Sequence, residues 1–117
     1  MSELKELQQK IIEFRDARDW EQFHNPKDVA ISLVLEASEL LEHFQWKDKT
    51  EVKRHVSEHR DGVGDELADV LYWVLLLAHD LKIDLPTALN KKMDKNAAKY
   101  PIKKAKGNHK KYTDLEK

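Results

Sequence analysis

Hydrophobic residues recur at helical spacing along most of this chain. Between residues 4 and 18 an apolar position returns every three or four residues, at Leu4, Leu7, Ile11 and Phe14. A longer apolar face runs from about residue 26 to residue 44: Val29, Ala30, Leu33, Val34, Ala37, Leu40, Leu41 and Phe44. This spacing is typical of amphipathic helices that bury one face. It predicts helices over residues 4–18 and about 26–44, joined by a loop that ends at the helix-start signal Asn25-Pro26.

The second half of the chain alternates polar and strongly apolar segments. Residues 50–59 predict a short polar helix, and residues 61–64, Asp-Gly-Val-Gly, predict a turn. A helix that is apolar nearly all round is predicted over residues 65–81, and a last helix begins near Asp84 and ends near residue 99. A helix with almost no polar face must be surrounded, and one small chain has too few other helices to do so. We therefore expect a homo-oligomer with residues 65–81 near the subunit interface.

The composition supports a helical protein. Charged residues make up 37% of the 117 positions, and only three glycines and three prolines are present, so signals that interrupt helices are sparse. We predict an all-α fold, a bundle of four to five helices whose four-helix core is completed by homo-oligomerisation. One domain, residues 1–101, is expected to carry this fold, and a basic tail, residues 102–117, is expected to be mobile.

Charge and cysteine content exclude several classes of function. A net charge of −1 argues against binding a nucleic-acid polymer or a membrane surface through bulk charge. The absence of cysteine excludes disulfides and zinc-thiolate sites and fits a reducing compartment. The first residues are polar, without a signal-peptide pattern, and the longest apolar run, near residues 70–78, is too short to span a bilayer. We expect a cytoplasmic protein.

Two pairs of carboxylates lie at the edges of the apolar helices. Glu36 and Glu39 form the first pair, and Glu66 and Asp69 form the second. Because three residues is close to one helical turn, each pair leaves one side of its helix. Such acids are commonly solvated, but the second pair has apolar lateral neighbours, and burying an unpaired carboxylate is costly. Four oxygen donors without a thiol favour a hard divalent cation, so the pattern predicts a Mg²⁺ or Mn²⁺ site.

A polar ridge marks the last predicted helix. Lys92, Asn96 and Tyr100 lie four residues apart in turn and therefore share one side of that helix. The ridge could be an ordinary solvated face, but its charged and neutral donors also suit phosphate oxygens near a metal. It is a candidate phosphate-binding site.

Aromatic side chains form a third candidate group. Trp20, Trp46 and Trp73 fall within or near the ends of the acidic helices. Core packing explains any single Trp, but flat aromatics together with His24 could also stack against a nucleobase and hydrogen-bond it. Four other histidines are dispersed along the chain and are interpreted as structural or surface residues: His43, His55, His59 and His79.

The acidic motif, with its spacing, resembles that of a known enzyme superfamily. Glu36-x-x-Glu39, a spacer of 26 residues and then Glu66-x-x-Asp69 resemble the metal motif of the all-α nucleoside triphosphate pyrophosphohydrolases of the MazG-like superfamily. Further segments resemble its dCTP pyrophosphatase-like branch: residues 18–24 (RDWEQFH), 44–47 (FQWK), 84–86 (DLP), 92–96 (KMDKN), 100–101 (YP) and 111–113 (KYT).

The resemblance implies a reaction and a site. Members of the superfamily cleave nucleoside triphosphates between the α and β phosphates, so dCTP or a related pyrimidine or modified deoxynucleotide is the expected substrate. By position, the Mg²⁺ ligands would be Glu36, Glu39, Glu66 and Asp69. The phosphate-binding residues would be Lys92, Asn96 and Tyr100. The base and sugar pocket would be lined by Trp20, His24, Trp46 and Trp73. Assembly as a dimer or a dimer of dimers is also implied.

The pattern leaves two candidates for the catalytic residue. The expected general base toward water is Glu36 or Glu39. Vertebrate members of the branch have a histidine where this chain has Ile11 and a tyrosine where it has Trp73, and both positions bear on base choice. Two alternatives remain: a nucleoside triphosphate pyrophosphatase of broad specificity, and a non-catalytic helical binding module that uses the acidic groove for a partner.

Overall fold

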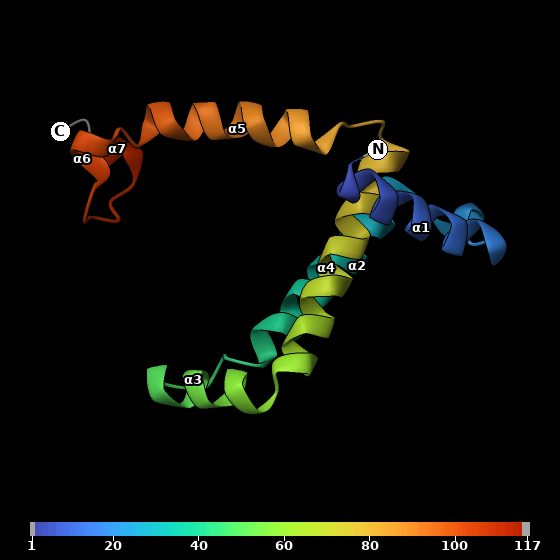
Figure 1. Ribbon diagram of the computed structural model, residues 1–117, viewed down its shortest axis with the longest axis horizontal. Helices are drawn as coiled ribbons and strands as arrows, with labels where there is room; N and C mark the ends of the chain where they lie inside the picture. Colours follow the sequence, from blue (N-terminus) through green and yellow to red (C-terminus); the bar gives the residue numbers. More distant parts are fainter. Residues whose placement is uncertain (1, 116–117) are drawn as a thin grey trace. The chain divides into compact units, whose positions relative to one another are not determined.

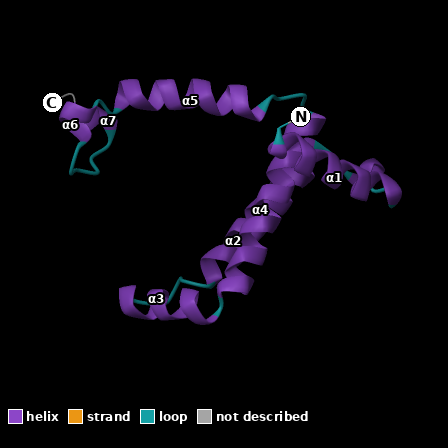
Figure 2. Ribbon diagram, in the orientation of Figure 1, coloured by secondary structure: helices purple, strands orange, loops and turns teal. Residues whose placement is uncertain are grey.

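The computed structural model describes residues 2–115, and every regular element within that range is helical (Figures 1 and 2). This confirms the predicted all-α class. The elements are α1 (Glu3–Ala17), the 3₁₀ turn η1 (Glu21–Phe23), α2 (Pro26–Glu42), α3 (Lys49–Glu58), α4 (Arg60–Asp80), α5 (Leu85–Lys99), α6 (Ile102–Ala105) and α7 (Tyr112–Leu115).

Local capping explains where the helices begin. The Ser2 hydroxyl accepts a hydrogen bond from the backbone N–H of Lys5 at 3.2 Å, and the side-chain oxygen of Asn25 accepts one from Asp28 at 3.0 Å. Asp84 caps α5 in the same way, accepting from the backbone N–H of Thr87 at 3.1 Å. Each cap satisfies a backbone donor that the first turn leaves unpaired. The predicted starts of these three helices are confirmed to within two residues.

The predicted turn at residues 61–64 is wrong. Helix α4 begins at Arg60 and includes both Gly62 and Gly64, and the backbone N–H of Val63 donates to the carbonyl of His59 at 3.0 Å. The break between α3 and α4 falls instead at His59, whose φ and ψ are −125° and 34°. Glycine within a helix costs only about 1 kcal/mol relative to alanine, so packing of the apolar remainder of α4 overrides its local preference.

The chain divides into two compact units, Met1–Lys82 and Ile83–Lys117. In the first unit, α2 and α4 lie side by side, while α1 packs on α4 and α3 follows α2 (Figure 1). The apolar core contains Ile12, Val29, Leu75, Leu76 and Ala78. The second unit contains α5 and the two short helices α6 and α7, which form part of the segment predicted to be a tail.

Helix α4 is only partly covered within the first unit. Leu75 and Leu76 are buried, but Leu67 toward its amino end remains 53% exposed. Helix α2 also exposes apolar side chains, including Val34 and Leu35. Burial of such surface stabilises proteins by about 25 cal/mol per Å², so these residues have a strong tendency to find a partner. No helix among residues 2–115 meets the length and hydropathy needed to cross a membrane.

A buried ion pair fastens α1 to the end of α4. Arg15 is 1% exposed, and its guanidinium donates two hydrogen bonds to the carboxylate of Asp80, at 2.7 and 2.8 Å. This contact lowers the pKa of Asp80 and raises that of Arg15, because each charge stabilises the other. The backbone carbonyl of Arg15 also accepts from the N–H of Trp20 at 3.2 Å. The pair therefore anchors the loop that carries Trp20 and His24.

Candidate active site

Three carboxylates meet where α2 lies against α4. Glu36 and Glu39 come from α2 and Glu66 comes from α4, and each offers an oxygen within 4.8 Å of the others. Glu36 and Glu66 are half-buried, whereas Glu39 is exposed. The spacing of three residues on α2 is what directs its two carboxylates toward the same neighbouring helix. We call these three residues the acidic cluster.

The acidic cluster is electrostatically unfavourable when its members are all ionised. Burial raises the pKa of Glu36 to about 7, with further contributions from a hydrogen bond to Glu39 and from the negative charges of Glu39, Asp69 and Glu66. Burial and Glu39 also raise the pKa of Glu66. Charged groups resist both loss of water and the approach of like charges. In the protein on its own, Glu36 therefore titrates near neutral pH.

The acidic cluster fits a hard divalent cation. One oxygen of Glu36 and one of Glu66, Oε2 in each case, is buried without a hydrogen-bond partner in the described part of the chain. A buried carboxylate oxygen left unpaired is costly. An all-oxygen donor set with neither thiol nor imidazole suits Mg²⁺ or Mn²⁺ better than softer metals. Asp69 lies outside this close group, but it is near enough for its charge to raise the pKa of both Glu36 and Glu66.

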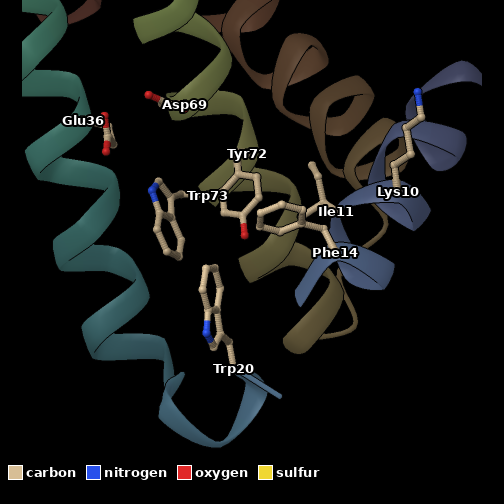
Figure 3. Close-up of a pocket in the computed structure, with 8 residues that line it drawn as sticks. All are labelled: Lys10, Ile11, Phe14, Trp20, Glu36, Asp69, Tyr72 and Trp73. Atoms are coloured by element: carbon tan, nitrogen blue, oxygen red, sulfur yellow. The ribbon is translucent and has the colours of Figure 1, made fainter. Parts of the chain in front are cut away.

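The acidic cluster borders a cavity of about 620 Å³, a size typical of small-molecule sites, which span roughly 300–1,000 Å³. Its lining comes from α1, the loop before η1, α2 and α4: Lys10, Ile11, Phe14, Trp20, Glu36, Asp69, Tyr72 and Trp73. Figure 3 shows the two carboxylates at one end and Trp20 at the other, with aromatic rings between them. A ligand here could meet a cation at one end and flat apolar surface at the other.

Edge-to-face contacts hold the aromatic walls of this cavity. The ring of Phe14 lies 5.7 Å from Trp20 and 6.4 Å from Tyr72, and Tyr72 lies 5.0 Å from Trp73. Interplanar angles of 74° to 90° put the positive edge of one ring against the negative face of the next. The guanidinium of Arg18 covers the outer side of Phe14, 3.7 Å from its centre. These contacts preorganise flat surfaces on which a ring could stack.

The chain is similar to known proteins over most of its length. The sequence profile of the MazG-like family matches residues 31–115, which include the acidic cluster and α5. The chain belongs to the MazG-like family. It is 41% identical over 114 residues to dCTP pyrophosphatase 1 of Mus musculus and 40% identical to that of Homo sapiens, covering 96% of this chain and 67% of each relative. The crystal structure of a pyrophosphatase from Archaeoglobus fulgidus superposes with a TM-score of 0.82 at 38% identity, covering 86% of this chain and 94% of the other.

The predicted base-pocket residues of this MazG-like chain separate into two groups. Trp20 and Trp73 line the cavity. His24 stands behind it, with its ring 5.7 Å from that of Trp73 and its Nδ1 3.5 Å from the guanidinium of Arg15. Trp46 follows the end of α2, is 86% exposed and does not line the cavity. A single chain therefore assembles only part of the predicted set around this cavity.

The predicted phosphate-binding residues of the MazG-like chain lie on α5, in the second unit. Asn96 is half-buried, and Lys92 and Tyr100 are exposed. Lys92 and Asn96 lie within α5 four residues apart and so share a side of it, whereas Tyr100 is the residue that caps its carboxyl end. Their role toward phosphate stays a prediction.

The cavity also contains residues that sequence reasoning missed: Lys10, Ile11, Phe14 and Tyr72. Ile11 and Phe14 belong to the apolar stripe of α1, which predicts core positions equally well. Tyr72 carries a usable signal, because it follows Asp69 by three residues and so leaves nearly the same side of α4. In addition, the expectation that the histidines are dispersed is wrong for His43, His55 and His59, whose rings lie together near the end of α2.

Proposed function

We propose that the chain is a Mg²⁺-dependent nucleoside triphosphate pyrophosphohydrolase that cleaves between the α and β phosphates, with dCTP or a related pyrimidine or modified deoxynucleotide as substrate. The observation that carries this proposal is the acidic cluster at the end of an aromatic cavity. Such a site fits a molecule with a polyanionic end and a flat ring. Relatives named dCTP pyrophosphatase 1 and a similar structure named a pyrophosphatase support the same reaction.

The acidic cluster would hold Mg²⁺ through Glu36, Glu39 and Glu66, with Asp69 beside it. When bound, the cation would neutralise phosphate charge and polarise the phosphoryl group under attack. Of the two predicted general bases, Glu36 is better placed to take a proton from water, since it lines the cavity and Glu39 does not. Glu39, being exposed, would serve mainly as a ligand.

The other residues would bind and orient the nucleotide. Trp20 and Trp73 would stack on the base, while Lys92, Asn96 and Tyr100 would bind phosphate oxygens. We propose a homodimer or homotetramer, supported by the uncovered apolar side chains of α2 and α4. The cysteine-free sequence fits the reducing cytoplasm, which we propose as the location.

A pyrophosphate-release assay tests the proposed reaction. The chain with Mg²⁺ is incubated with dCTP, dTTP, dUTP, dATP and 5-substituted pyrimidine triphosphates, and phosphate is measured with and without inorganic pyrophosphatase. We expect phosphate only when pyrophosphatase is added, and fastest with dCTP or a related pyrimidine. Equal rates across the panel would favour broad specificity. No release from any triphosphate would overturn the proposal and favour a helical binding module.

Loss of a stacking ring is expected to weaken nucleotide binding more than turnover. Base–aromatic stacking contributes about 1–3 kcal/mol, so Trp73→Ala should raise KM roughly 5- to 150-fold while kcat changes less. Phe23→Ala is the matched control, because Phe23 is an aromatic residue that is 66% exposed and outside the cavity. Steady-state kinetics with the preferred triphosphate measures the changes in KM and kcat separately. A similar KM for Trp73→Ala and Phe23→Ala would contradict the aromatic base site.

Stability of the metal-free protein should fall as pH rises. The pKa of Glu36 is about 7 in the folded chain against an ordinary value of 4.5, so the folded state binds more protons between those values. Folding stability from this group is therefore complete below the lower pKa and is lost as pH rises through about 7. Thermal melts should show that Mg²⁺ stabilises the protein more at about pH 8 than at about pH 5.5.

Two variants separate this effect from general charge effects. Glu36→Gln should flatten the pH dependence, whereas Glu42→Gln, which removes an exposed carboxylate of the same helix, should leave it unchanged. A Mg²⁺ effect of equal size at both pH values in the unaltered protein would contradict the assignment of Glu36.

A further inference from the structure

Three imidazole rings come together near the end of α2 and the junction between α3 and α4. His43 caps the carboxyl end of α2, His55 lies in the last turn of α3, and His59 follows α3 directly. Nδ1 of His43 and Nε2 of His55 are 2.7 Å apart. The ring of His59 stacks on that of His55 at 4.4 Å with an interplanar angle of 18°. We call these residues the histidine cluster.

The contact between His43 and His55 directs two ring nitrogens at one point. Only one proton can lie between them, so at least one nitrogen presents its lone pair to the other. Neutral imidazole nitrogens of this kind are the preferred ligands of Zn²⁺ and neighbouring transition metals. Opening the contact from 2.7 to about 3.3 Å would give the N···N separation of a tetrahedral site with Zn–N bonds of about 2.0 Å.

His59 is placed to supply a third ligand. His55 and His59 are four residues apart, the same spacing at which two helical histidines bind one zinc ion in metalloproteases. The Nδ1 of His59 lies 3.3 Å from the backbone carbonyl of His55, and its Nε2 has no partner among the described residues. The His59 side chain is exposed, so its ring is free to change rotamer, and acting as the third ligand requires such a change.

The surroundings of His55 favour its neutral ring. Burial lowers the pKa of His55, and so do the nearby positive charges of His59, Lys47 and His43, while Glu58 opposes them. The ring of Phe44 lies 6.1 Å from that of His43 and 6.2 Å from that of His55, so one aromatic side chain borders both rings. The His43 and His55 side chains are half-buried, whereas the His59 side chain is exposed.

We propose that His43, His55 and His59 form a binding site for a transition-metal cation, with Zn²⁺ the best fit, separate from the acidic cluster. His43 follows Glu39 by four residues and Gly62 precedes Glu66 by four, so the two sites lie about one helical turn apart along α2 and α4. The ligands differ in kind, imidazole nitrogen in one site and carboxylate oxygen in the other. A metal bound to the histidine cluster would fasten α3 to the end of α2.

Zinc titration of the full chain with saturating Mg²⁺ present tests the proposal. By isothermal titration calorimetry we expect one Zn²⁺ site in the unaltered protein, with His55→Gln weakening its affinity at least tenfold. His79→Gln is the matched control, because His79 is an exposed histidine of α4 outside the cluster. His59→Gln provides a second variant at an exposed position, where the fold is expected to be unaffected, and it should also weaken Zn²⁺ binding.

Cobalt provides a direct view of the ligands. Co²⁺ added in place of Zn²⁺ should give visible absorption bands of a nitrogen-ligated tetrahedral ion, and these bands should be lost in His55→Gln but kept in His79→Gln. Zinc affinity that is unchanged by both His55→Gln and His59→Gln would overturn the proposal. So would Zn²⁺ binding that is lost in Glu39→Gln and retained in the histidine variants, because it would place the ion in the acidic cluster.

Discussion

Glu66→Gln is expected to lower kcat/KM by on the order of a thousandfold or more, since loss of a metal ligand removes several kcal/mol of transition-state stabilisation. The variant keeps the size of the side chain and removes its charge. Because the pKa of Glu66 is raised by burial and by its acidic neighbours, losing that charge should not destabilise the metal-free fold. Activity should therefore fall without a fall in melting temperature, measured by pyrophosphate release and by thermal denaturation.

The control for this prediction comes from α2. Glu42 lies three residues after Glu39 but is exposed and outside the acidic cluster, so Glu42→Gln should retain nearly full activity. Glu39→Gln should resemble Glu66→Gln. Asp69→Asn tests whether Asp69, the fourth predicted metal ligand, contributes to activity although it lies outside the acidic cluster. If Glu66→Gln turned over dCTP at the unaltered rate with saturating Mg²⁺, the acidic cluster would not be the catalytic metal site.

Asp80→Ala is expected to lower the free energy of unfolding by about 3 kcal/mol, because it leaves the charge of Arg15 buried without its partner. Arg15 is 1% exposed and donates both of its terminal nitrogens to Asp80. Urea denaturation monitored by circular dichroism measures the change. Since the pair anchors the loop of Trp20 and His24, KM for nucleotide should also rise.

Two companion variants make the stability result specific. Asp65→Ala removes an exposed carboxylate from the same helix and should cost less than about 0.5 kcal/mol, as is usual for surface positions. Combining Arg15→Met with Asp80→Leu removes both charges and should recover much of the loss, because apolar replacements of a buried pair are well tolerated. Equal stability of Asp80→Ala and Asp65→Ala would show that the pair contributes little.

The sequence predicted most of the helices and the acidic cluster because both are periodic. An apolar stripe at helical spacing fixes which face of a helix is buried. Two acids three residues apart beside that stripe must therefore leave the same side of the helix. The start of α4 was mispredicted because Gly62 and Gly64 carry a local signal for a turn, whereas the helix is decided by packing of the residues that follow.

Residues whose roles depend on distant partners could not be predicted in this way. Arg15 reads as a surface residue of α1, and its partner Asp80 lies 65 positions away. Phe14 has the same spacing whether it packs in a core or lines a cavity. The contact between His43 and His55 depends on the angle at which the chain returns after α2, which no local pattern specifies.

Helix α4 sets the distance between the acidic cluster and one aromatic wall of the cavity. It carries Glu66 at the acidic cluster and Trp73 on the aromatic wall, seven residues apart, so a rise of 1.5 Å per residue sets these points about 10 Å apart along its axis. Inserting a residue between Glu66 and Trp73 would lengthen this distance. It would also rotate Trp73 by about 100° around the helix axis. The distance from Glu66 to Trp73 is therefore set by the register of one helix, whereas Trp20, the other ring at this cavity, is carried by a loop and can move independently of α4.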